Sequence, residues 1–176
     1  MYTPLYIAEP LLSTALTPNA QRKAFPRNST MLTIEQRMQL DMFLEPFEAW
    51  TIETISENGG TQLVSSFAPR LHGNGEIDFI APYPAGSRAF ELITAYPVVT
   101  FVVSAIEVEH RLEGFARAVV VQQSWERAEL LAYLQWRTPG AIDRLGSAIE
   151  VVVFHPINLR FFDCRRGRST FEVRWH

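Results

Sequence analysis

The spacing of hydrophobic residues changes several times along the chain, and each change predicts a new structural element. Over 33–45 apolar side chains recur with the period of an amphipathic helix. The predicted apolar stripe consists of Ile34, Met38, Leu40, Phe43, Leu44 and Phe47. Thr33 and Gln36 have the spacing of a capping box at the start of this helix. From Trp50 onward apolar and polar positions alternate, interrupted by glycine-containing turns. This pattern predicts a meander of three strands at 50–55, 62–68 and 77–80.

The second half of the chain predicts further strands, separated by short helices. Ser87 is a suitable N-cap for a helix that ends near Ala95, and Pro97 prevents this helix from continuing. Thr138 followed by Pro139 marks the start of another helix, because proline is favoured at the first helical position. The remaining helix begins at 124, and β-branched and aromatic residues predict the remaining strands at 98–106, 112–121, 149–163 and 170–175.

Together these elements predict a mainly β protein with six or seven antiparallel strands and three or four short helices. A strand at the edge of an open sheet exposes unpaired backbone groups, and closure of the sheet removes such edges. We therefore expect a small closed or split antiparallel β-barrel. A chain of 176 residues has the size of one domain, so we expect a single core.

The segment 1–30 follows a different pattern and predicts an N-terminal arm. Four prolines interrupt any helical period there and favour extended and turn conformations. Apolar residues such as Leu5, Ile7 and Leu11 lie between these prolines. Such an arm either frays in solvent or lies along another surface. Because apolar side chains gain free energy by leaving water, its composition favours packing on the body or on a second subunit. The domain then comprises 31–176.

Charge and composition narrow the possible classes of function. The net charge is −3, with eight basic against sixteen acidic residues over 31–155 and a basic excess at both ends. Such a protein is not expected to bind nucleic acid. The chain has no apolar run of about 18 residues and no basic start of a signal peptide, so we expect a cytoplasmic protein without a membrane segment. The single cysteine, Cys164, fits a reducing compartment.

The stretch 77–114 contains several short motifs in a specific order. They are Ile77-Asp78-Phe79-Ile80, Ser87-Arg88-Ala89-Phe90-Glu91-Leu92, Tyr96-Pro97, a β-branched strand and Arg111-Leu112-Glu113-Gly114. This order resembles the pyridoxamine 5′-phosphate oxidase family, where an aromatic-rich strand leads to a Ser-Arg-Lys segment, a Glu-Leu pair, an Asn-Pro and an Arg-x-x-Gly strand. The resemblance covers about 31–163.

The resemblance implies that 31–176 is an FMN-binding split barrel, a homodimer whose flavin lies in a cleft between the subunits. Ser87 and Arg88 would hold the flavin phosphate at the N-terminus of the short helix, where unpaired amides and the helix dipole favour an anion. The resemblance further implies that the second and third strands hold the flavin ring through backbone groups. The candidates that line the ring are Val64, Ser65, Ser66 and Phe67, and Arg70 is the nearest candidate for an additional cation.

The sequence also departs from the family pattern. Ala89 stands where the family has Lys, and the strand that is Arg-x-x-Leu-Leu-Lys in the family carries no charge over 61–67. The flavin-contacting Gln of the family corresponds to about Glu109, whose carboxylate would repel a phosphate. Each charge-assisted hydrogen bond contributes roughly 1.5–3 kcal/mol, so the loss of three cations predicts FMN affinity weaker by several orders of magnitude.

Three functional hypotheses follow. The first is a flavin-binding protein or FMN-dependent oxidoreductase that acts on a small molecule, with no catalytic residue assigned. The second is a non-enzymatic split-barrel module that has lost tight FMN binding and holds haem or another planar ligand. The third is a small-molecule-binding barrel of another family. The four histidines lack the spacing of a metal site, so no metal is expected.

Overall fold

The computed structural model describes residues 31–175 except 48, 57–58, 105–108 and 147, so the expected arm over 1–30 lies outside the described residues. The helices are α1 (Ile34–Leu44), α2 (Arg88–Ala95), α3 (Ser124–Arg137) and α4 (Pro139–Asp143). The strands are β1 (Ala49–Ser56), β2 (Gly59–Ser66), β3 (Ala68–Leu71), β4 (Ile77–Pro84), β5 (Val98–Val103), β6 (His110–Val120), β7 (Ile149–Asp163) and β8 (Arg168–Arg174).

The described part contains eight strands in one antiparallel sheet, one more than the upper number predicted. The additional strand arises because the segment predicted as one strand over 62–68 is divided at Phe67. β2 pairs with β1 whereas β3 pairs with β4, so the chain changes neighbours at this residue. The predicted meander of three adjacent strands was therefore wrong after its first hairpin. The mainly β class, the antiparallel pairing and the number of helices agree with the prediction.

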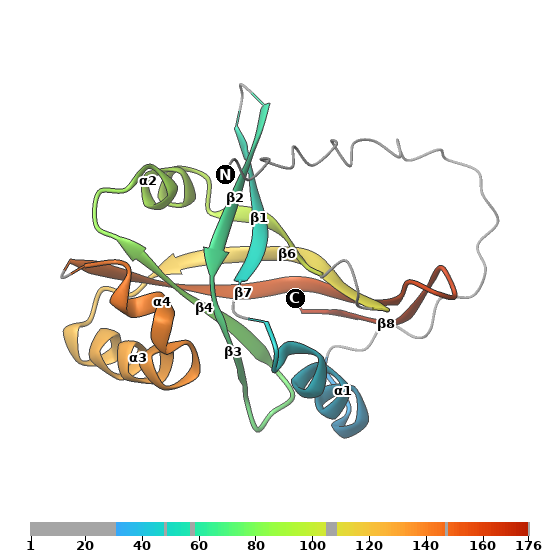
Figure 1. The fold of residues 1–176 in the computed structure, drawn as a ribbon. Coiled ribbons are helices and arrows are strands. Elements are labelled where there is room, and N and C mark those ends of the chain that lie inside the picture. Colours follow the sequence, from blue (N-terminus) through green and yellow to red (C-terminus); the bar gives the residue numbers. More distant parts are fainter. Residues whose placement is uncertain (1–30, 48, 57–58, 105–108, 147, 176) are drawn as a thin grey trace, which may run out of the picture.

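The strand order is β2-β1-β5-β6-β7-β4-β3, and β8 pairs with β7 beside this path (Figure 1). β2 and β3 lie at opposite ends of the path but are consecutive in the chain. The buried Phe67 between them therefore brings the two edges of the sheet together around the core. Among the described residues no ladder joins β2 to β3, so the barrel has the split form.

A cluster of aromatic side chains fills the interior of the curved sheet. Trp50 lies on Phe67 with 5.0 Å between ring centroids, and Phe79, Phe101 and Phe154 are within 5.5 Å of Trp50. All five side chains are at most 2% exposed. Full burial of such a side chain contributes about 1.5–3 kcal/mol, so this cluster is a major source of stability.

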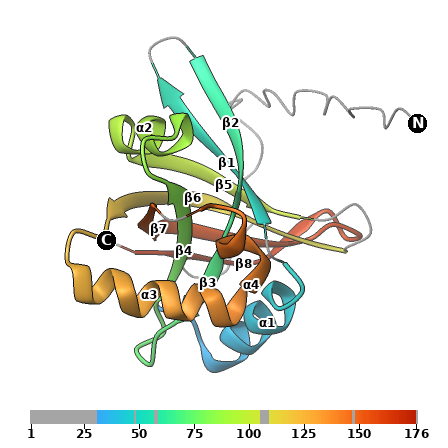
Figure 2. The ribbon, with the colours of Figure 1, turned by 60° about the vertical axis from the view of Figure 1, so that its left-hand side comes forward.

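Helix α3 covers a second, smaller core on the other face of β4 and β7 (Figure 2). Leu130 and Leu134 of α3 are buried against Ile80 of β4 and Val153 of β7. Successive side chains of a strand point to opposite faces, so β4 contributes alternately to the two cores. This central part of the sheet is therefore buried on both faces.

The local signals that predicted the helix starts are confirmed. Thr33 and Gln36 form the capping box of α1, and Ser87 caps α2. The predicted apolar stripe of α1 was partly wrong, because Ile34 and Met38 are exposed. In the described ranges, no helix is both long enough and apolar enough to cross a membrane. The residues by which α1 packs on the core are Leu40, Phe43 and Leu44.

Candidate ligand-binding site

The N-terminus of α2 comes directly after β4, where the chain leaves the sheet. Gly86 has a φ of +69°, a conformation that L side chains rarely adopt, and it turns the chain into the helix. The Ser87 hydroxyl then accepts a hydrogen bond of 3.3 Å from the backbone N–H of Phe90. The N–H groups of Arg88 and Ala89 have no hydrogen-bond partner within the described part. The first turn of α2 therefore presents two donors to an anion.

Arg88 is the first residue of α2 and its side chain is exposed. Neither an ion pair nor a hydrogen bond joins this side chain to another described residue. A guanidinium in this place can form charge-assisted hydrogen bonds with a phosphate or a carboxylate. We call Ser87, Arg88 and the two free N–H groups the α2 cradle.

The four residues predicted to line a flavin ring are divided between the two faces of β2. Val64 is 79% exposed and Ser66 is half-buried, whereas Ser65 and Phe67 are buried. This is the alternation expected of a strand that has one face on the core. Val64 and Ser66 are therefore the two side chains of this group that a ligand can reach from outside.

Ser65 connects the end of β2 to the end of β4 near the α2 cradle. Its side chain lies next to Tyr83, which precedes Ser87 by four positions. Tyr83 is 3% exposed, and its hydroxyl has no hydrogen-bond partner in the described ranges. Burial raises the pKa of Tyr83 above its ordinary 10 while Ser65 acts in the opposite direction, so the hydroxyl stays protonated. Tyr83 is thus a protonated hydroxyl buried in the core at the end of β4, with Ser65 as a polar neighbour.

The structure does not bring Arg70 to the α2 cradle. Arg70 on β3 forms an ion pair of 3.2 Å with Asp78, which lies at the opposite end of β4 from Ser87. At about 3.3 Å per residue, the part of β4 that separates Asp78 from Pro84 spans roughly 20 Å. Arg70 therefore already has a partner and lies far from the anion-binding end of α2.

Asp78 is the centre of a polar cluster that joins β3, β4 and β7. His72 Nε2 and His155 Nδ1 each lie 2.7 Å from its carboxylate, in addition to Arg70. Burial alone would raise the pKa of Asp78, but the hydrogen bonds of His155, His72 and Arg70 lower it to about 2. The same hydrogen bond raises the pKa of His155 above 6.5, although burial opposes this shift. We call these four residues the Asp78 cluster.

The Asp78 cluster satisfies its own members. One nitrogen of each histidine is directed at the carboxylate, and no group of three His, Cys, Asp or Glu side chains in the described part could hold a metal ion. A buried carboxylate is stable only when it is paired in this way. We therefore assign the cluster a structural role.

Two rows of side chains run across six strands on the outer face of the sheet, in the part that α3 does not cover. Their members follow from the pairing registers, and each row runs from β2 through β1, β5, β6 and β7 to β8. The first row is Val64, Thr51, Val102, Glu113, Arg160 and Glu172. The second row is Gln62, Glu53, Thr100, Phe115, Asn158 and Arg174.

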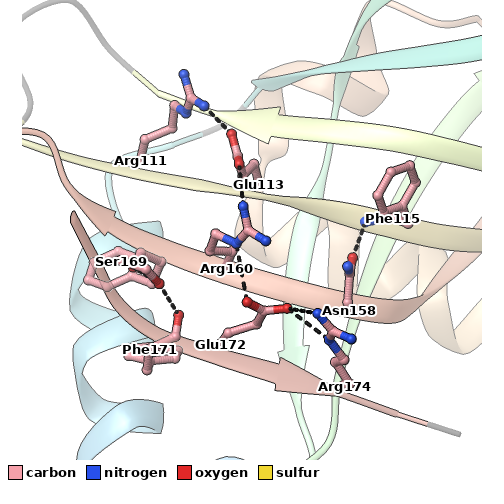
Figure 3. A network of polar contacts seen from close by, with 10 residues as sticks. Arg111, Glu113, Phe115, Asn158, Arg160, Ser169, Phe171, Glu172 and Arg174 are labelled. Carbon is pink, nitrogen blue, oxygen red and sulfur yellow. Dashed lines mark hydrogen bonds and ion pairs between the residues drawn. The ribbon is translucent and has the colours of Figure 1, made fainter. Parts of the chain in front are cut away.

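Charged side chains of these rows, together with Arg111, form a continuous network across β6, β7 and β8 (Figure 3). Arg111 pairs with Glu113, and Arg160 lies 3.9 Å from Glu113 and 3.3 Å from Glu172. Arg174 donates to Glu172 through two nitrogens, each at 2.8 Å. The Glu172 side chain is only 7% exposed, so two guanidinium groups compensate its charge. These arginines are already paired, in contrast to Arg88.

A hollow of about 240 Å³ lies between the two rows. Its walls include Val102, Phe115 and Asn158, and Gly114 forms part of its floor. A Cβ atom at Gly114 would lie 2.2 Å from the carbonyl oxygen of Asn158, so only glycine allows β6 and β7 to approach here. Binding sites for small molecules usually measure about 300–1,000 Å³, so this hollow is by itself smaller than such a site.

Sequence reasoning did not find Tyr83 or the two rows. The sequence does contain a signal for Tyr83: it lies four positions after Phe79 in the same strand, so both side chains point to the core. No comparable signal exists for the rows, since they follow from the registers between strands that are distant in the sequence.

Known proteins match this chain in fold but not in sequence. The sequence matches no family model and no curated protein. The fold is similar to a Clostridium acetobutylicum protein related to general stress protein 26 of B. subtilis, of the pyridoxinephosphate oxidase family (TM-score 0.56, 11% identity, 78% of this chain and 92% of that chain). It is also similar to General Stress Protein 26 from Bacillus anthracis (0.57, 10%, 74% and 95%).

A third similar structure is HutZ, the heme storage protein from Vibrio cholerae (TM-score 0.55, 16% identity, 68% of this chain and 88% of that chain). At such identities the likeness concerns the fold alone. The eight-stranded antiparallel sheet, open between β2 and β3, agrees with it. The chain therefore has the split-barrel fold shared by these proteins, as the sequence predicted.

Proposed function

We propose that this protein is a divergent member of the pyridoxamine 5′-phosphate oxidase-like family and binds FMN between two copies of the chain. The observation that carries the proposal is the α2 cradle, which combines an exposed, unpaired Arg88 with two free N–H groups. Both features favour a phosphate. The phosphate of FMN would lie at this helix terminus.

The residues around the cradle fit a flavin phosphate with modest affinity. Arg88 supplies one cation, while Arg70 is paired with Asp78 and Ala89 has no charge. Tyr83 adds a protonated hydroxyl that has no partner in the described part of the chain. An unpaired buried donor destabilises the free protein, and a bound group that accepts from it would remove this cost. The set therefore resembles a ligand site rather than a closed core.

A second copy of the chain would complete the site. Val98, Phe115 and Val119 on the outer face of β5 and β6 are 45–46% exposed, and the hollow beside Phe115 is by itself smaller than a usual ligand site. Apolar side chains gathered on one face are typical of an interface. We propose that this face binds the partner and that Val64 and Ser66, on the same side of β2, contact the flavin ring.

The flavin, when bound, supplies the electron transfer, and the protein supplies its position and its electrostatic environment. In this site the chain's own residues bind the phosphate, orient the ring and exclude water on one side. The substrate class under this proposal is a small organic molecule that exchanges electrons with the ring in a cleft between the copies.

Binding and assembly should be measured together. Purified protein is titrated with FMN, flavin fluorescence is followed, and sedimentation velocity gives the oligomeric state. Phe115→Asp should weaken both the dimer and FMN binding. Trp125→Asp is a matched control, because Trp125 is an exposed aromatic residue on α3 and should change neither. A monomer that does not bind FMN at any concentration would contradict the proposal.

Haem is a second candidate ligand, and the small number of cations at the α2 cradle favours it. The similarity to HutZ, a heme storage protein, supports the same candidate. Titration with hemin separates the two. A Soret band that shifts on addition of protein, together with no response to FMN, would replace the flavin by haem.

A further inference from the structure

Helix α1 carries apolar side chains on two faces. One face packs on the core, as described above. On the other face Ile34, Met38 and Met42 recur at intervals of four, which places them in one line along the helix. Their exposed fractions are 77%, 62% and 74%. We call these three residues the outer stripe. An exposed line of large apolar residues over a whole helix is unusual on a surface that contacts only water.

The outer stripe leads to an apolar groove at the C-terminal end of α1. Met42, Phe43 and Phe47 form one wall of this groove, and Phe161 with His110 forms the other. The groove has a volume of about 450 Å³, larger than the hollow on the outer face of the sheet. The His110 ring lies parallel to the Phe161 ring at 5.1 Å. We call this site the α1 groove.

We propose that residues 5–12 of the same chain bind in the α1 groove and along the outer stripe. This segment contains apolar side chains of a size that fits such a site, and prolines on both sides hold it away from a helical conformation. The apolar residues concerned are Leu5, Tyr6, Ile7, Leu11 and Leu12.

The length of the connection allows this contact. The chain enters α1 just after Met31, and the groove lies at the other end of the helix, roughly 17 Å away at 1.5 Å per residue. The connecting residues 13–30 can span up to about 60 Å when extended. They therefore reach the groove with enough length left for turns at Pro18 and Pro26.

The charges of the connecting segment 13–30 and of α1 are complementary, because Arg22, Lys23 and Arg27 lie in this segment and the only charged residue of 5–12 is Glu9. The segment 1–30 carries three basic residues and one acidic residue. On and next to α1, Glu35, Asp41 and Glu45 are exposed, against the single basic residue Arg37. The attraction is weak in salt, but it acts between groups that the chain already holds close together. Apolar contact thus favours residues 5–12 as the occupant, while charge favours a path of the connecting segment along α1, and the site is separate from the α2 cradle.

A spin label on Cys164 tests the contact in the full-length protein. Cys164 is the only cysteine of the sequence and it is exposed. It lies in the turn between β7 and β8. Phe161 of β7 and Thr170 of β8 line the α1 groove, so the label is close to the groove. In a ¹⁵N-labelled sample that carries the label, the amide signals of residues 5–12 should be lost. Reduction of the label should restore them.

A mixed sample identifies whose segment binds. Spin-labelled protein without ¹⁵N is mixed with ¹⁵N-labelled Cys164→Ser protein. The proposal expects the amide signals of residues 5–12 to survive in this mixture. Loss of these signals in the mixture would mean that the segment of a second copy occupies the groove, and it would overturn the proposal.

Matched variants exclude a general effect of the label. Met42→Glu in the outer stripe should restore the signals of residues 5–12, whereas Trp125→Glu, at an exposed aromatic residue on α3, should not. Leu11→Glu should also restore them, and it leaves the folded domain unchanged. Signals that persist in the wild-type protein, or that are lost equally in all three variants, would contradict the proposal.

Discussion

At one end of β4 the carboxylate of Asp78 has three partners, whereas just beyond the other end the guanidinium of Arg88 has none among the described residues. The two regions lie roughly 20 Å apart on one strand. Charges that satisfy each other inside the protein contribute to its stability. A charge without such a partner, next to free helix N–H groups, is instead available to a ligand. Changes to the first region should therefore alter stability, and changes to the second should alter binding.

The largest expected effect is on stability. Asp78→Asn removes the charge that binds two histidines and Arg70, so unfolding in urea should show a loss of about 2–3 kcal/mol. FMN binding to the folded variant should stay unchanged. Asp143→Asn, at an exposed position of α4, should change stability by less than about 0.5 kcal/mol. An equal loss of stability in both variants would contradict the structural role assigned to the Asp78 cluster.

Arg88→Ala should have the opposite profile. Loss of a charge-assisted contact of roughly 1.5–3 kcal/mol should weaken FMN binding by about 10- to 100-fold, while the unfolding midpoint stays the same. Isothermal titration calorimetry measures the affinity. Arg168→Ala, an exposed arginine on β8, is the control and should bind FMN like the wild type. Unchanged affinity in Arg88→Ala would place the phosphate elsewhere.

Tyr83→Phe tests whether a bound ligand uses the buried hydroxyl of Tyr83. The hydroxyl is buried without a partner in the described part, so its removal should leave the stability of the free protein unchanged or raise it by about 1 kcal/mol. The gain should shrink when FMN is present. Thermal unfolding with and without FMN measures both values, and a clear loss of stability without ligand would show that the hydroxyl is already used.

The smallest expected effect is a pH dependence. The Asp78 contact raises the pKa of His155 above 6.5, so its contribution is complete below pH 6.5 and is lost as the pH rises through the folded-state pKa. Wild-type stability should decline over this range, and His155→Gln should not show this decline. His110→Gln should retain it. At the acidic end the Asp78 contribution is lost only as the pH falls from 3.8 to about 2.

Local signals in the sequence predicted the positions that depend on neighbours in the chain. The caps of α1 and α2 follow from spacings of three residues, and the structure confirms both. The succession of helices and strands along the chain and the split barrel followed from hydrophobic period together with family resemblance, whereas the order of the strands in the sheet did not. The caps depend only on residues close together in the chain, and the fold class depends on the overall pattern of elements. One sequence is therefore enough to predict both.

Contacts between distant segments could not be predicted in the same way. Asp78 and His155 are 77 positions apart, and only the register of β4 on β7 brings them together. The same holds for Arg70, which had been expected near the flavin but is paired with Asp78. On α1 the helical period was correct, but it could not show that Ile34 and Met38 face away from the core.

The most direct test of the account is a binding cycle with two ligands and two proteins. FMN and riboflavin differ by the phosphate, and wild type and Arg88→Ala differ by the guanidinium. The account predicts that the wild type prefers FMN about 10- to 100-fold and that Arg88→Ala loses most of this preference. An equal preference in both proteins, or none in the wild type, would show that the α2 cradle does not bind the phosphate.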